Sequence, residues 1–162
     1  MPIEEPAARY DAQLKTLMRL VYILDAAGEG VLGKGAPAMM YQAGRDAGIK
    51  ARAPGVSDDL EEAFSMVLTE GEEVWHIERW QDPGQEEPWM DGGNCRSTWI
   101  IFRRCPLLSL ARHVGSSPGG LLCQALHGFM AGSMERIMKR RVDHRVEHCG
   151  PRACKILVEV RD

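Results

Sequence analysis

Three cysteines in this chain have a spacing that could bind a metal ion. Cys123 lies near the start of an apolar helical segment, and Cys149 and Cys154 stand on either side of a short turn. Thiolates completed by a carboxylate or an imidazole suit zinc in a tetrahedral arrangement. We therefore expect a zinc site that ties the end of the chain to the helix.

The spacing leaves the remaining ligand open. The residues that could complete the site are two neighbours of the turn, a helix residue and a cysteine at a strand end: Glu147, His148, His127 and Cys105. His127 follows Cys123 by one helical turn, so both would share a helix face. Without a metal, Cys123 would be a small buried residue. Cys149 and Cys154 could instead form a disulfide, which a reducing compartment disfavours.

The N-terminal half reads as helical. Apolar residues at helical spacing predict helices over about 8–26, 36–48 and 58–69. We expect the first to stop at Gly28 and the third to begin at Ser57-Asp58, whose side chains suit a helix N-terminus. The segment Gly28 to Gly35 imitates nucleotide-binding loops, but no strand precedes it and Gly35 replaces the required Ser or Thr. We therefore interpret this segment as a connection between two helices.

The sequence of the C-terminal half predicts strands on either side of one helix. Aromatic and β-branched runs predict strands over 74–80 and 97–102, joined by a long loop. Ser116-Ser117-Pro118 would start the helix that follows, and Gly128 and Gly132 would let a neighbouring backbone approach it. Two alternating segments, 142–148 and 154–160, predict a β-hairpin. This order implies one α+β domain with an antiparallel sheet, spanning residues 1–162 with its core over about 15–160.

Composition narrows the class of protein. The chain has 162 residues and a net charge of -3, and it has no clustered basic excess of the kind that binds nucleic acid. No apolar run approaches the roughly 18 residues needed to span a membrane, and the acidic N-terminus does not read as a signal peptide. We expect a cytoplasmic protein that binds neither nucleic acid nor membrane directly.

Both ends of the chain resemble the vinyl-4-reductase domain family. The family's closing signature is similar to Cys123-x4-Gly128-Phe129-x2-Gly132 followed by Val146-Glu147-x-Cys149-x4-Cys154-x-Ile156. Its tyrosine-x-x-glycine-arginine helix is similar to Met40-Tyr41-Gln42-Ala43-Gly44-Arg45-Asp46-Ala47-Gly48, which follows Val31-Leu32-Gly33. The resemblance extends over most of the chain from about residue 15.

The resemblance implies a fold, a ligand and a metal. Family members occur alone and as the sensor half of phenol- and toluene-responsive transcription activators. Their fold is shared with haem nitric-oxide-binding domains and Golgi-transport subunits. They enclose a hydrophobic pocket and often form homodimers. Carried over, the zinc ligands would be Cys123, Glu147, Cys149 and Cys154. Here only His148 separates Glu147 from Cys149, where the family has two residues, so His148 is the alternative ligand.

A ligand pocket should be apolar with a few polar anchors. The aromatic and methionine residues that could line it are Tyr41, Trp75, Trp99, Phe102, Phe129 and Met130. The same residues could equally form an ordinary core. We expect a domain that binds or senses a hydrophobic or aromatic small molecule, with a structural zinc site and no catalytic role.

Two alternatives use other chemistry. His113 and His127 could ligate haem, and the four cysteines Cys105, Cys123, Cys149 and Cys154 could hold an iron–sulfur cluster in a redox or gas sensor. The family name also points to a tetrapyrrole-related reductase component. Such a role needs an electron source, and the sequence carries no nicotinamide or flavin fingerprint.

Overall fold

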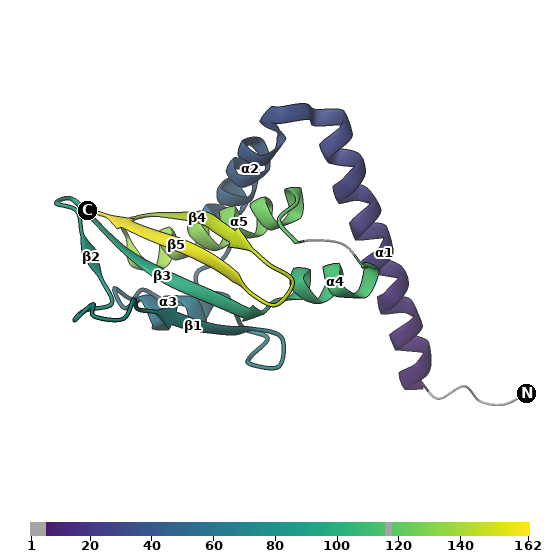
Figure 1. Ribbon diagram of the computed structural model, residues 1–162, viewed down its shortest axis with the longest axis horizontal. Helices are drawn as coiled ribbons and strands as arrows, with labels where there is room; N and C mark the ends of the chain where they lie inside the picture. Colours follow the sequence, from purple (N-terminus) through teal and green to yellow (C-terminus); the bar gives the residue numbers. More distant parts are fainter. Residues whose placement is uncertain (1–5, 116–117) are drawn as a thin grey trace, which may run out of the picture.

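The computed structural model describes residues 6–115 and 118–162. An antiparallel sheet packs one face against helices that lie behind it in Figure 1. The strand order is β1-β3-β5-β4, and β2 pairs with β3. The strands are β1 (His76–Trp80), β2 (Met90–Asp91), β3 (Cys95–Arg104), β4 (Arg141–Cys149) and β5 (Cys154–Arg161). The helices are α1 (Pro6–Leu32), the 3₁₀ turn η1 (Gly33–Gly35), α2 (Ala36–Lys50), α3 (Leu60–Val67), α4 (Pro106–Val114) and α5 (Leu121–Met138). The predicted α+β class with an antiparallel sheet is confirmed.

The core lies between the sheet and α3 and α5. Alternate residues of β3 and β5 face it, because successive side chains of a strand point to opposite faces. Phe102 pairs with Cys154, and Ile100 pairs with Ile156 on the same inner face. The predicted hairpin of β4 and β5 is confirmed, and so are the two strands that became β1 and β3.

Helices α2 and α5 pack backbone against backbone. A side chain at Gly128 would overlap the carbonyl oxygen of Tyr41, and one at Gly132 would overlap that of Arg45. This confirms the close approach predicted from the two glycines. Arg45 itself is buried at the same interface and forms ion pairs with Glu135 and Asp143. The pairing compensates for the burial of its charge.

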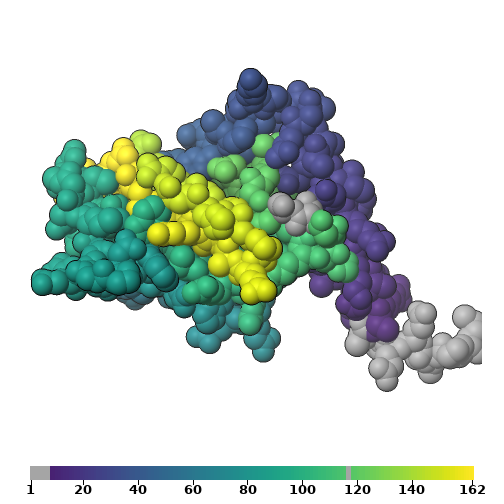
Figure 2. Space-filling model, viewed as in Figure 1, coloured from purple at the N-terminus to yellow at the C-terminus, as the bar shows by residue number. Residues whose placement is uncertain are grey.

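The first helix is longer than predicted. It continues through Gly28 to Leu32, because a glycine weakens a helix without necessarily ending it. Near that point α1 meets the start of α5, where Leu121 lies 3.0 Å from the position a side chain on Gly28 would take. Elsewhere α1 stands out along one end of the molecule (Figure 2). Most of the exposed large apolar side chains among the described residues belong to it.

The start of α5 also differs from the prediction. Ser116 and Ser117, the expected cap, lie outside the described residues, and Pro118 precedes the helix. The helix begins at Leu121 after Gly120, which has no side chain to cap it. Asp25 of α1 takes that role, and its Oδ1 accepts a 2.7 Å hydrogen bond from the backbone nitrogen of Leu122. A cap supplied from about a hundred residues away leaves no local sequence signal.

Helix α4 was not predicted at all. Cys105 is its N-cap and Pro106 occupies its first turn, a position that suits proline. The helix ends at Gly115, which adopts a left-handed conformation with φ of 70°. It is a short helix of nine residues, Pro106–Val114. Its position matters because it places Cys105 beside the final hairpin.

Candidate functional site

Four cysteines from distant parts of the chain gather at one end of the sheet. They are the N-cap of α4, a residue in the first turn of α5, and the two residues that flank the β4–β5 turn: Cys105, Cys123, Cys149 and Cys154. Ionisation of one thiol affects the others, since Cys149 and Cys105 both raise the pKa of Cys123. Cys105 and Cys123 likewise raise the pKa of Cys154. These four residues are called here the thiol cluster.

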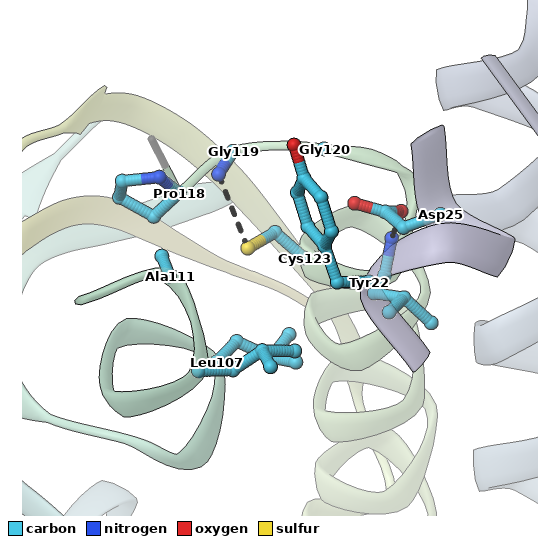
Figure 3. A pocket seen from close by; sticks show the side chains of 10 residues that line it. Tyr22, Asp25, Leu107, Ala111, Pro118, Gly119, Gly120 and Cys123 are labelled. Carbon is cyan, nitrogen blue, oxygen red and sulfur yellow. Dashed lines mark hydrogen bonds between the residues drawn. The ribbon is translucent and has the colours of Figure 1, made fainter. Parts of the chain in front are cut away.

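Backbone amides point at two of these sulfurs. The backbone nitrogen of Leu108 lies 3.3 Å from Cys105 Sγ. The backbone nitrogen of Gly119 lies 3.3 Å from Cys123 Sγ (Figure 3). Amide donors and helix N-termini both favour a thiolate over a thiol. Burial acts in the opposite direction and is stronger here, since it raises the pKa of Cys123 to about 12. A bound cation would reverse that balance, because a coordinated thiol is deprotonated.

Cys149 and Cys154 interact directly. They are cross-strand partners in the hairpin, and both are free thiols. The interaction between the two thiols lowers the pKa of Cys149 and raises that of Cys154. Gly119 approaches the same pair, since a side chain there would lie 3.7 Å from Cys149 Sγ. The loop before α5 thus connects Cys123 to the hairpin cysteines.

The other predicted metal ligands lie apart from the thiol cluster. Glu147 is exposed, and its carboxylate pairs with Arg145 at 2.5 Å. His148 is exposed and pairs with Lys155 across the hairpin. His127 is buried in the core beside Phe102. Within residues 6–115 and 118–162, no three Cys, His, Asp or Glu side chains converge closely enough to hold an ion as they stand. The thiols would have to rotate toward a common point.

A second cluster lies deeper in the core, where four rings meet from four elements. Phe64 of α3 and Phe102 of β3 pack edge to face at 6.2 Å between ring centres. His127 of α5 lies 5.4 Å from Phe102, and His144 of β4 lies 5.8 Å from Phe64. The two imidazole centres are 5.9 Å apart. This ring cluster combines apolar walls with two polar rings.

The imidazoles of the ring cluster lack hydrogen-bond partners. Nδ1 of His127 and both ring nitrogens of His144 are buried, and none finds a partner among the described residues. Burial lowers the pKa of His127 to about 4 and that of His144 to about 3. Both rings are therefore neutral near pH 7. His144 was not singled out from the sequence, although its place between Val142 and Val146 in an alternating strand marks an inward position.

Three of the predicted pocket residues lie at or near the ring cluster. Phe102 belongs to it, and Met130 is a core residue on the same helix as His127. Tyr41 of α2 borders it, because its hydroxyl accepts a 2.8 Å hydrogen bond from the backbone nitrogen of His144. Phe102 and Met130 thus lie in the core, and Tyr41 lies at its edge beside His144.

The other three predicted pocket residues point elsewhere. Trp75 packs at the margin of the core, and its indole nitrogen donates to Glu70 at 2.7 Å. Trp99 lies on the outer face of the sheet, where the Lys155 ammonium sits 4.2 Å from its ring centre. Phe129 faces a surface groove between α2 and α5 and is 36% exposed. The six residues do not line one pocket.

Surface hollows occur near both clusters. A small cavity between α1, α4 and α5 reaches Cys123 and is bordered by Tyr22 and Asp25 (Figure 3). A groove of about 430 Å³ runs between α2, α5 and β4 and is lined by Tyr41, Gln124 and His144. A third, of about 520 Å³, is apolar and separates α1 from α4.

Comparisons with known proteins identify the fold. No protein-family model matches the chain, and no curated protein matches it. Among solved structures, the chain matches the crystal structure of the phenol-responsive sensory domain of the transcription activator PoxR with phenol. The match covers 90% of this chain and 73% of that one, with a TM-score of 0.56 and 16% sequence identity. The two proteins share a fold.

The resemblance noted in the sequence pointed to the same kind of domain, the sensor of phenol-responsive activators. None of the helices among the described residues combines the length and the hydropathy that a membrane span requires. What the comparison shows is the shared fold.

Proposed function

We propose that this chain is a ligand-binding sensory domain of the vinyl-4-reductase type, and that its ligand is a small hydrophobic or aromatic molecule. The observation that carries the proposal is the fold shared with a phenol-responsive sensory domain over 90% of the chain. The ring cluster supports it, because aromatic side chains with a few polar groups are what a small aromatic ligand requires. No catalytic residue is proposed.

Calorimetric titration with phenol and toluene tests this function. We expect saturable binding that weakens at least several-fold in Phe102→Leu, because that ring forms one wall of the ring cluster. Phe129→Leu is the matched control, since Phe129 faces the surface groove and should leave binding unchanged. Absence of saturable binding for both compounds would refute the proposed function. Equal weakening by the two variants would place the ligand elsewhere.

We also propose that the thiol cluster binds one zinc ion through Cys105, Cys123, Cys149 and Cys154. Four thiolates form a common closed zinc site. The Cys105 and Cys123 sulfurs already accept backbone hydrogen bonds of the kind that orient metal ligands. Cys105 replaces Glu147 in this proposal, because the Glu147 carboxylate is engaged with Arg145 on the exposed side of β4. Bound zinc would join α4, α5 and the hairpin.

Elemental analysis of the purified protein tests the metal proposal. We expect about one zinc per chain and its loss in Cys105→Ala, whereas Glu147→Ala and Cys95→Ala should retain it. Retention in Cys105→Ala with loss in Glu147→Ala would restore the glutamate as ligand. If the analysis finds iron and the protein absorbs visible light, the bound group is an iron–sulfur cluster or haem and the zinc assignment is wrong. A metal-free and colourless protein would refute the proposal.

We propose further that α1 mediates self-association into a homodimer. It carries most of the exposed large apolar side chains among the described residues, and exposed apolar patches commonly mark protein–protein contacts. Leu20 and Leu24 are one turn apart and 52% and 71% exposed. Sedimentation should show a dimer that dissociates in the double variant Leu20→Glu and Leu24→Glu. A monomeric parent protein would refute this part of the proposal.

A further inference from the structure

We propose that His127 and His144 are the polar anchors of the buried ligand site, and that its ligand is a neutral aromatic or apolar molecule carrying one hydroxyl group. This inference rests on the proposed sensory function and specifies its ligand class. These two residues are the anchors because ring nitrogens of both imidazoles are buried and form no hydrogen bond with any described residue.

The two imidazoles are costly as purely structural residues. A buried polar group without a hydrogen bond is unfavourable, so most such groups in proteins are paired. Three ring nitrogens here have no partner among the described residues, and both rings are 5% exposed. Phenylalanine would fill similar space without that cost, as Phe64 and Phe102 do beside them. The unpartnered nitrogens are therefore positioned to bind a polar group of a ligand.

The arrangement of the rings fits a hydroxyl group. A neutral imidazole carries one donor and one acceptor nitrogen, and a hydroxyl also donates and accepts. Two hydrogen bonds of about 2.8 Å that meet at one oxygen connect nitrogens roughly 4.6 Å apart. Rings with centres 5.9 Å apart can present nitrogens at that separation. One hydroxyl could thus bridge His127 and His144.

The surroundings define the rest of the ligand. Phe64 and Phe102 border the two imidazoles and would contact an aromatic or aliphatic body. Burial keeps both imidazoles neutral, so the site offers no positive charge to an anionic ligand. A carboxylate or phosphate would be buried there without a counter-charge, which is unfavourable. A neutral hydroxylated compound has no such cost.

A surface groove lies beside one end of the proposed site. The groove of about 430 Å³ between α2, α5 and β4 is bordered by His144 and Tyr41. Met130 and Met134 of α5 are core neighbours on the helix that carries His127. Methionine side chains adapt their shape readily, so they can shift when a ligand separates the four rings. Entry would therefore need side-chain movement more than rearrangement of the sheet.

Phenol and toluene form a matched pair of probes, because they differ by a hydroxyl in place of a methyl group. We expect the full chain to bind phenol roughly ten-fold more tightly than toluene, the difference that one or two neutral hydrogen bonds contribute. His127→Phe and His144→Phe should remove this preference and keep toluene binding within about three-fold. His113→Phe, a substitution at an exposed histidine, should behave as the parent protein.

A spectroscopic measurement makes the test independent of variant stability. The imidazole nitrogen NMR signals of His127 and His144 should shift with phenol and shift less with toluene. If the parent binds toluene as tightly as phenol, or if the variants keep the preference for phenol, the histidine proposal is wrong while the sensory function stands. If neither compound binds, the sensory function fails as well. Unshifted imidazole signals in the phenol complex would also overturn the histidine proposal.

Discussion

Cys149 and Cys154 face each other across the final hairpin because β4 contains one extra residue before the turn. The pairing of β4 with β5 shifts between Val146 and His148, which leaves Glu147 as a bulge. Val142 and Val146 are inward residues, so strict alternation would have turned His148 inward and Cys149 outward. The bulge reverses this and brings Cys149 opposite Cys154. It therefore assembles half of the thiol cluster.

Deletions within β4 test how strand register orients Cys149. Removing Glu147 alone takes away the bulge but leaves Cys149 two residues after the inward Val146, so Cys149 should still face Cys154. Removing Glu147 together with His148 places Cys149 directly after Val146 and should turn it outward. For the double deletion we expect faster alkylation of Cys149 by iodoacetamide, measured by mass spectrometry, and loss of any metal bound by the thiol cluster. Glu147→Ala keeps the chain length and should alkylate like the parent. Faster alkylation after the deletion of Glu147 alone, or unchanged reactivity after the double deletion, would contradict this account of how strand register orients Cys149.

The glycine contact between α2 and α5 should be sensitive to a single methyl group. A side chain at Gly132 would overlap the backbone oxygen of Arg45, so Gly132→Ala should lower the free energy of unfolding by about 1–3 kcal/mol or more. Gly30→Ala is the control, because no atom lies within 4 Å of the new group. It should raise stability by about 0.5–1 kcal/mol. Chemical denaturation measures both, and equal effects would argue against tight packing.

The buried histidines should make stability depend on pH. Above about pH 6.5 both imidazoles are neutral in the folded and unfolded chain. Below that pH the unfolded chain takes up protons that the folded protein resists until about pH 4 at His127 and about pH 3 at His144. The free energy of unfolding should therefore fall as pH drops from 6.5 toward 4, by roughly 3 kcal/mol per histidine at the acidic end.

A double variant separates this effect from the titration of carboxylates. His127→Phe with His144→Phe cannot take up these protons, so its stability should change less between pH 6.5 and 4 than that of the parent. His113→Phe should keep the parent's slope, since His113 is exposed. Denaturation at several pH values measures the three slopes. A double variant with the parent's slope would contradict the assignment to these residues.

Asp25 should hold α1 against the start of α5. Asp25→Ala removes the acceptor for the Leu122 amide and should lower the free energy of unfolding by about 1 kcal/mol. We also expect faster proteolytic cleavage within α1. Asp11→Ala is the control on the same helix, where the lost partner is an exposed lysine and the change should stay within about 0.5 kcal/mol. Equal cleavage rates in the two variants would argue against the cap.

Much of the fold follows from local sequence patterns. Alternation in β3, β4 and β5 predicted the antiparallel strands, and helical spacing predicted α2 and α3. Gly128 and Gly132 predicted the close helix contact. The spacing of Cys149 and Cys154 predicted that they flank the turn of one hairpin. In each case the property depends on neighbours within one or two turns or strands, which a sequence records directly.

Only the tertiary structure could decide the features that depend on distant residues. The start of α5 is capped by Asp25, the inward turn of Cys149 follows from strand register, and Cys105 joins the thiol cluster because α4 begins there. Nδ1 of His127 and both ring nitrogens of His144 have no partner among the described residues, and this too depends on everything packed around them. Local periodicity determined which residues face inward along most elements. Which inward residues meet, and which remain without partners, was set by packing between segments far apart in the chain.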